Sequence, residues 1–330
     1  MPYEQAMHHS DPDIRSRLTV AHLPAMPQIL LKLIEHCQAD KAGMAELADL
    51  IAKDAAMVAR IIGIANSSAY HRSGRLFGLE QSLIALGTDM VKMLLISESV
   101  RQIFSNFSRP NGTDLRAFWK HSLMAAIAAR MIAVKIGYMQ TEEAYLAGLL
   151  HDAGRLALLA TVPGEYTANF FVPDDDDLCI TEQRTLQITH AEAGAWLIER
   201  WNLDSFLADS VLYHHEPQGR PESAHPLIRI VAVAHLLANP SQDDPILETA
   251  GTLCGLTADE LTAIRNHAIE EVWKTAEYLG IELDDTDNSP TPAMPTSTPV
   301  SATDTAKERL TEQVHSMMLA SEAGRSFTGQ

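Results

Sequence analysis

The sequence predicts a mostly helical protein, and two observations carry that prediction. Hydrophobic residues make up 46% of the chain but aromatic residues only 6%, and Val, Ile and Thr are sparse beside Ala and Leu, a balance that favours helices over strands. Apolar residues also recur every three or four positions through most of the chain, as they do on the buried face of a helix. At 330 residues the chain is long enough for two domains or one large one.

The formal net charge of −18 argues against broad binding to nucleic acid or to anionic membranes, because phosphate contacts need clustered Lys and Arg. We therefore expect a protein or a small molecule as partner. The three cysteines, Cys37, Cys179 and Cys254, are widely spaced, which is typical of reduced thiols rather than of a disulfide framework. No signal peptide is visible and no uncharged run reaches ~18 residues, so we expect a cytoplasmic protein that does not cross a membrane.

A first block of short helices is expected over 23–107. Apolar spacing predicts five of them, at about 29–37, 44–53, 55–65, 79–86 and 88–104. Asp54 is the expected N-cap of the third helix, Gly87 ends the fourth, and Thr88 or Asp89 caps the fifth. The two helices around Gly87 are spaced like a helix-turn-helix, but acidic and basic residues alternate on them. They form no basic face, so DNA binding is not expected.

A second block is expected over 113–280, after a short linker that contains Pro110 and Gly112. Six helices are predicted here, at about 114–136, 141–161, 190–201, 205–213, 226–238 and 257–279. The acidic stretch 174–177 is expected to be a solvated loop.

Both ends of the chain are expected to lie outside these blocks. The polar segment 1–22 is expected to be a flexible N-terminus. Residues 284–304 are rich in Asp, Pro, Ser and Thr and should form a disordered linker. Residues 306–323 recover a helical pattern, which we interpret as a short C-terminal helix that docks on a partner or pairs with itself.

The predicted helix at 141–161 is too apolar to face water, yet it contains the adjacent pair His151 and Asp152. Burying a carboxylate without a hydrogen-bond or ion-pair partner costs on the order of several kcal/mol. This pair is therefore either a hydrogen-bonded core pair or part of a metal site.

Further metal-ligand residue types lie on the helices of the second block or at their ends: His121, His190, His214 and His215. Imidazole together with carboxylate suits Fe, Mn, Zn or Ni, and this many ligands would leave room for two ions. His121 lies on the helix before His151, which a short connection would place alongside. The alternative is that each histidine is a core residue, and His190 has a local role in a capping box that starts at Thr189.

The order of these residues resembles the HD phosphohydrolase superfamily, including its cyclic-dinucleotide-hydrolysing HD-GYP branch. The chain is more similar to HDOD, the HD-related output domain of bacterial signalling proteins. The resemblance covers about 23–239 and is carried by these motifs: Leu23-Pro24-Ala25-Met26-Pro27, Ile64-Ala65-Asn66-Ser67, Leu79-Glu80-Gln81-Ser82-Leu83, Trp119-Lys120-His121-Ser122, Ala147-Gly148-Leu149-Leu150-His151-Asp152 and His190-Ala191-Glu192-Ala193-Gly194-Ala195.

The resemblance implies an all-helical fold in which an N-terminal helical subdomain packs on an HD-like bundle. It also implies a signalling or scaffolding module that has lost part of the hydrolase site. Three departures from the hydrolase pattern agree with that implication. His235 stands where HD families place a late metal-binding Asp, Arg155 replaces the usual Lys, and no Gly-Tyr-Pro follows His215.

Three functions are therefore considered. The first is a non-enzymatic regulatory module that contacts protein partners and whose pocket, with His235 as a further ligand, senses a metal or a small ligand such as a cyclic dinucleotide. The second is a metal-dependent phosphohydrolase of nucleotides or cyclic dinucleotides, in which a metal-bound water attacks and Arg155 contacts phosphate. The third is a pure scaffold whose histidines remain from an ancestral site.

Overall fold

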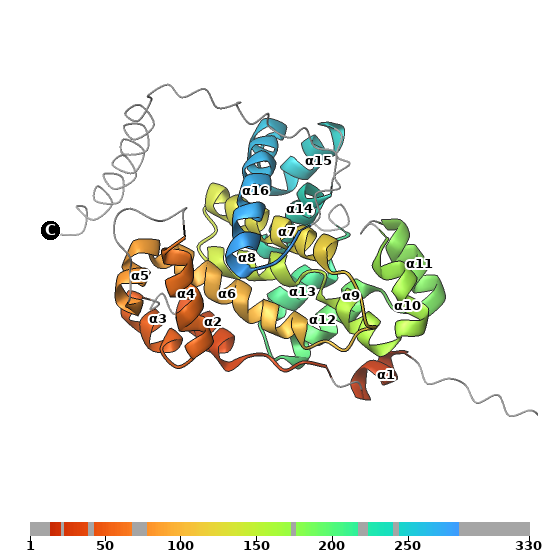
Figure 1. The fold of residues 1–330 in the computed structure, drawn as a ribbon. Helices are drawn as coiled ribbons and strands as arrows, with labels where there is room; N and C mark the ends of the chain where they lie inside the picture. The colour runs from red at the N-terminus through yellow and green to blue at the C-terminus, as the bar shows by residue number, and fades with distance from the viewer. Residues whose placement is uncertain are drawn as a thin grey trace, which may run out of the picture. The chain divides into compact units, whose positions relative to one another are not determined.

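The computed structural model describes residues 14–20, 23–38, 43–67, 78–172, 176–216, 224–239 and 244–283. Within these ranges every regular element is an α-helix, so the all-helical prediction is confirmed (Figure 1). The expected linker at 284–304 and the expected C-terminal helix at 306–323 lie outside the described residues. Among the helices that are described, none is both long enough and apolar enough to cross a membrane.

The five helices predicted in the first block are present with nearly the expected bounds. They are α2 (Gln28–Gln38), α3 (Met44–Ile51), α4 (Ala55–Ala65), α5 (Leu79–Leu86) and α6 (Thr88–Ser105). A further helix, α1 (Ile14–Val20), lies in the segment that we expected to be flexible. Leu18 of this helix is 1% exposed, and the Arg17 side chain donates to the carbonyl oxygen of Thr161 at 3.3 Å. Packing on the second block thus orders α1 despite its polar sequence.

One of the two caps predicted in this block is present and the other is not. The Oδ1 atom of Asp54 accepts hydrogen bonds from the amides of Ala56 and Met57, as an N-cap does. The prediction that Thr88 or Asp89 caps α6 was wrong, because Thr88 is already helical and Gly87 takes the cap position with φ of 80°. A positive φ is accessible to glycine, so the chain passes from α5 to α6 in one residue.

The second block contains the predicted helices and three more. The predicted ones are α7 (Arg116–Ile136), α8 (Thr141–Leu150), α9 (Ala153–Thr161), α12 (His190–Arg200), α13 (Ser205–Leu212), α14 (Pro226–Ala238) and α16 (Ala258–Leu279). The unpredicted ones are α10 (Pro163–Phe170), α11 (Asp176–Leu186) and α15 (Asp244–Cys254). Pro163 starts α10 at its first turn, where its missing N–H is harmless. Asp176 and Asp177, the last two residues of the acidic stretch that was expected as a loop, are the first two residues of α11.

The helix predicted as one piece at 141–161 is broken into α8 and α9 at His151 and Asp152. The break lets the two pieces pack on different neighbours. A Cβ added at Gly148 would meet the backbone of Ala125 on α7, and one added at Gly154 would meet the backbone carbonyl of His190 on α12. Each glycine therefore marks a close backbone approach that a single straight helix would not provide.

The described residues of both blocks contribute to one hydrophobic core within one compact unit. In Figure 1, α7 and α14 cross near the middle of the second block, and they pack against each other and against α8. Between the blocks, the buried hydroxyls of Ser97 on α6 and Tyr145 on α8 lie 2.7 Å apart in a hydrogen bond. The first block thus rests directly on the helix that leads to the His151–Asp152 pair.

Candidate metal centre

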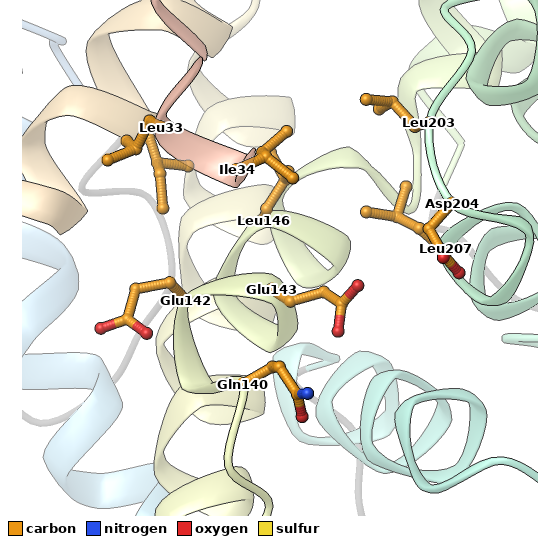
Figure 2. A pocket seen from close by; sticks show the side chains of 10 residues that line it. Leu33, Ile34, Gln140, Glu142, Glu143, Leu146, Leu203, Asp204 and Leu207 are labelled. Atoms are coloured by element: carbon orange, nitrogen blue, oxygen red, sulfur yellow. The ribbon is translucent and has the colours of Figure 1, made fainter. Parts of the chain in front are cut away.

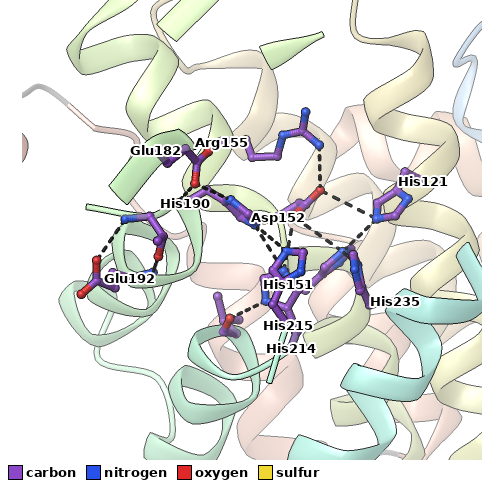
Figure 3. Close-up of polar contacts among 12 residues, drawn as sticks. His121, His151, Asp152, Arg155, Glu182, His190, Glu192, His214, His215 and His235 are labelled. Carbon is purple, nitrogen blue, oxygen red and sulfur yellow. Dashed lines mark hydrogen bonds and ion pairs between the residues drawn. The ribbon is translucent and has the colours of Figure 1, made fainter. Parts of the chain in front are cut away.

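All the metal-ligand residues proposed from the sequence lie in one cluster (Figure 3). They are His121 on α7, His151 and Asp152 between α8 and α9, His190 at the start of α12, His214 and His215 after α13, and His235 on α14. Most of this cluster is closed to solvent. His151, Asp152, His190 and His214 are 0% exposed and His235 is 2% exposed.

The carboxylate of Asp152 lies among the imidazole rings. Its Oδ1 atom is 3.6 Å from Nε2 of His190 and 3.7 Å from Nε2 of both His151 and His214. This oxygen is buried and accepts no hydrogen bond from the described residues. A buried carboxylate oxygen without a donor is costly, and a cation among the same nitrogens would remove that cost.

Hydrogen bonds on the far side of the rings aim their nitrogens at this oxygen. Nδ1 of His151 lies 2.7 Å from the carbonyl oxygen of Gly148, and Nδ1 of His214 lies 2.6 Å from that of Val211. Because a carbonyl only accepts, each Nδ1 carries a proton, which leaves Nε2 as the atom that can offer a lone pair to a metal ion. This is how proteins orient a histidine that binds a metal through Nε2.

His190 is held in the same way by Glu182, a residue that sequence reasoning missed. Oε2 of Glu182 accepts from the backbone amide of His190 at 2.7 Å and from its Nδ1 at 2.8 Å, and Oε1 accepts from the Tyr166 hydroxyl at 2.5 Å. Burial alone would raise the pKa of Glu182, but the neighbouring His190 and the hydrogen bonds from His190 and Tyr166 outweigh it and keep that pKa below its ordinary value. Glu182 therefore stays a carboxylate.

Several pairs of ring nitrogens lie so close together that the two nitrogens of a pair cannot both point a lone pair at each other. Nε2 of His121 is 3.1 Å from Nε2 of His151, and Nε2 of His190 is 3.1 Å from Nε2 of His215. Nδ1 of His235 is 3.3 Å from Nε2 of His151. Since Nε2 of His151 and His190 are acceptors, a proton or a metal ion must lie between the atoms of each pair.

The ligand atoms form three groups, and the atoms of each group lie within 4.8 Å of one another. The groups are His121, His151 and His235; His151, Asp152 and His214; and Cys179, His190 and His215. Cys179 lies on α11 and was not among the residues proposed from the sequence. Imidazole nitrogens with one carboxylate and one thiol fit Zn, Fe, Ni or Mn, so the residues present fit a transition-metal centre.

The comparison with protein families agrees with the motifs. The model of the HDOD domain matches residues 23–217 of the chain. The chain belongs to the HDOD family. The resemblance read from the motifs is thereby confirmed, with a matched region that ends just after His215.

Solved structures with the HDOD-like fold come from several bacteria. An HDOD domain protein of Geobacter sulfurreducens is 24% identical, with a TM-score of 0.67 over 81% of this chain and 99% of its own. A proposed signal transduction protein of Marinobacter aquaeolei has a TM-score of 0.64 at 21% identity, covering 82% of this chain and 61% of its own. A proposed phosphohydrolase of Shewanella amazonensis has a TM-score of 0.61 at 21% identity, covering 81% and 97%. At these identities they establish the shared fold.

Among curated proteins, this HDOD chain matches one from Treponema pallidum (strain Nichols) with 23% identity over 221 residues. The match covers 65% of this chain and 42% of the relative, so the chain spans less than half of that protein's length.

Arg155 is the residue that we expected to contact phosphate in a hydrolase. It lies beside the His–Asp cluster, and it is buried, with 6% of its surface exposed. Its Nη2 atom donates to the carbonyl oxygens of Phe170 and Val172, each at 2.8 Å, and its Nη1 atom lies 3.5 Å from Oδ2 of Asp152 (Figure 3). A phosphate would have to compete with these groups. Arg155 instead ties Asp152 to the end of α10.

The HDOD protein also has a small pocket, with a cavity volume of about 30 Å³, whose lining includes none of the proposed ligands. It lies between α2, α8 and the start of α13, with Leu33, Leu146 and Leu207 in its lining (Figure 2). Its acidic groups are engaged within the fold. Glu143, for example, accepts from the hydroxyl of Tyr138 at 2.8 Å. The pocket is therefore an apolar hollow rather than a second cluster of reactive groups.

Proposed function

We propose that this HDOD protein is a regulatory module of bacterial signalling that acts through protein contacts and not through catalysis. In this proposal its His–Asp cluster is a buried transition-metal centre. The observation that carries the proposal is burial: Asp152 and three of the histidines around it are fully enclosed, and Arg155 is bound to backbone carbonyls. A substrate phosphate needs access that this arrangement does not offer.

Metal binding is supported by the chemistry of the donors. Asp152 presents a buried oxygen without a hydrogen bond, and His151, His190 and His214 present Nε2 lone pairs to it. A bound ion would supply the positive charge that these groups face. Because the ligands come from α7, the α8–α9 break, α12, the end of α13 and α14, metal bound across the cluster would also link five parts of the bundle.

A regulatory role is supported by the connection from Asp152 to the surface. Arg155 contacts Asp152 with one nitrogen and the carbonyls of Phe170 and Val172 with the other. Phe171 and Val172 are apolar and 57% and 41% exposed. A metal at Asp152 competes with Arg155 for the carboxylate, so occupancy of the centre would alter the support of an exposed apolar segment of the kind that contacts proteins.

Metal analysis of the purified full chain tests this proposal. The wild type should contain at least one equivalent of Zn, Fe, Mn or Ni, and His151→Ala should contain less. His267→Ala is the control, because His267 is exposed on α16 and should leave the metal content unchanged. Absence of metal from the wild type, both as purified and after loading, would overturn the metal centre and favour the scaffold with leftover histidines.

The phosphohydrolase is the second candidate, and one observation favours it. Oδ1 of Asp152 faces His190 and His214, while Oδ2 lies 3.8 Å from Nε2 of His121, so the carboxylate could bridge two ions. Hydrolysis of cyclic dinucleotides by the metal-loaded wild type, lost in His151→Ala and kept in His267→Ala, would establish this function and refute the regulatory one.

A further inference from the structure

Helix α11 places two chemically different side chains on one face. Cys179 and Glu182 are three residues apart, so both lie on the same side of this helix. Glu182 is fully buried and bound to His190, which fixes the direction of that face. Cys179 is partly exposed, and its sulfur lies within 4.8 Å of ligand nitrogens of His190 and His215.

The two nitrogens near this sulfur are themselves arranged for a cation. Nε2 of His190 is an acceptor because Nδ1 donates to Glu182, and it is 3.1 Å from Nε2 of His215. The same Nε2 is 3.6 Å from Oδ1 of Asp152, the fully buried oxygen that accepts no hydrogen bond from any residue that the structure describes. A sulfur and two nitrogens therefore converge at this end of the cluster, and a carboxylate oxygen lies beside one of these nitrogens.

The opposite end has a different donor set. There His121, His151 and His235 bring three imidazole nitrogens together, and that group contains no sulfur ligand. Thiolate is a soft ligand that selects Zn²⁺ over harder ions such as Mn²⁺, whereas imidazole and carboxylate accept either. The cluster is thus chemically asymmetric from one end to the other.

We propose that Cys179, His190 and His215 form a thiolate-containing zinc subsite, with Asp152 as the oxygen donor at its inner edge. This inference rests on the proposed metal centre and adds that one end of the centre is selective for zinc. On binding, the Cys179 thiol loses its proton to solvent and its sulfur bonds to Zn²⁺, with no change of oxidation state. Cys179 then makes this end a zinc site, which the HD-type ligands alone do not specify.

Cobalt substitution tests the sulfur bond directly. The full-length wild type, stripped with a chelator and reloaded with Co²⁺, should show the near-ultraviolet charge-transfer absorption of a cobalt–thiolate bond. Cys179→Ser should lose that absorption and bind about one equivalent less Zn²⁺. His267→Ala, an exposed change on α16, should behave as the wild type.

A second measurement needs no variant and covers the case in which Cys179→Ser does not fold. Zn²⁺ should slow alkylation of Cys179 at least about tenfold, because a metal-bound thiolate is shielded from the reagent. Cys254 is the internal control: it belongs to none of the ligand groups, and burial raises its pKa to about 11. Its slow alkylation should not respond to Zn²⁺.

The outcomes separate the two proposals. Zinc binding with an unchanged cobalt spectrum in Cys179→Ser, or with unprotected Cys179, refutes the thiolate subsite and leaves the metal centre in place. No binding of Zn²⁺ or Co²⁺ by the wild type refutes both.

Discussion

At the scale of single residues, the buried carboxylate of Asp152 requires positive charge nearby. It is fully buried, and its Oδ1 atom faces three imidazole nitrogens without accepting a hydrogen bond. An ionised carboxylate is stable in such a place when positive charge lies against it. Protonated imidazoles or a metal ion can supply that charge, and the two cases differ in how the protein responds to metal.

Replacing Asp152 with Asn tests that difference, because the substitution keeps the shape and removes the charge. In the wild type, Zn²⁺ at a hundred times its dissociation constant should add about 2.7 kcal/mol to the free energy of unfolding. D152N should lose most of this gain, while H267A should retain it. Thermal unfolding with and without Zn²⁺ measures the effect. An equal gain in stability on adding Zn²⁺ to the wild type and to D152N would show that Asp152 does not bind the ion.

Tyr145 gives a prediction for alkaline pH that is independent of metal. It is fully buried and hydrogen-bonded to Ser97, and burial raises its pKa to about 12. The folded state holds this proton more tightly than the unfolded state, whose tyrosine pKa is about 10. The stability linked to Tyr145 is therefore fully present below pH 10 and is lost as pH rises towards 12.

The variant Tyr145→Phe isolates that contribution. At pH 7 it should be less stable by about 1 kcal/mol, because it loses one buried hydrogen bond. Between pH 10 and 12 its stability should fall less steeply than that of the wild type, by an amount on the order of 2 kcal/mol. Urea unfolding across this pH range measures both, and parallel curves for the two proteins would contradict the assignment.

At the scale of elements, the break between α8 and α9 depends on close packing against α12. A Cβ at Gly154 would meet backbone atoms of His190 and Gly194, which have little room to move. Gly154→Ala should therefore destabilise the protein by about 1–3 kcal/mol through overpacking. Gly63→Ala is the matched control, since Gly63 lies in α4 with open space around its added Cβ, and it should stabilise by about 0.5–1 kcal/mol.

Chemical denaturation of both glycine variants decides this point. Opposite signs for the two substitutions are expected, because helix propensity favours alanine at both positions and only Gly154 has an opposing backbone contact. A neutral Gly154→Ala would mean that α9 and α12 can separate at no cost.

Local patterns were enough to predict most helices, because caps and apolar spacing act within a few residues. The expected capping box at Thr189 begins α12, and α16 begins after Thr257 as expected, where a second capping box is present. The division of 141–161 was not predictable in this way, because its cause is a contact between Gly154 and the backbone of α12, far along the chain. Pro163 follows the end of α9 and also begins α10, a helix that apolar spacing did not predict.

At the scale of the whole molecule, the ligands on predicted helices could be identified from the sequence, but Cys179 and Glu182 on α11 could not. The order of the histidines and Asp152 placed them in a known pattern, and the fold brings them together. Glu182 and Cys179 were missed because their helix begins in an acidic stretch that was interpreted as a loop. A carboxylate at 182 between Leu178 and Leu186, on the buried stripe of a helix, was the available sign.

The spread of the ligands over the fold leads to a prediction about the entire described unit. Ions held by groups from α7, the α8–α9 break, α12, the end of α13 and α14 together restrict five segments, so removal of the metal should loosen all of them. Hydrogen exchange of zinc-loaded and chelator-treated protein should show faster exchange at these segments without metal. Local exchange in α3 and α4, which carry none of the ligands, should change little. In His151→Ala the segments that carry His121 and His235, which share a ligand group with His151, should no longer respond to the chelator. A response confined to one helix would mean that the ion binds at a surface group and does not join the bundle.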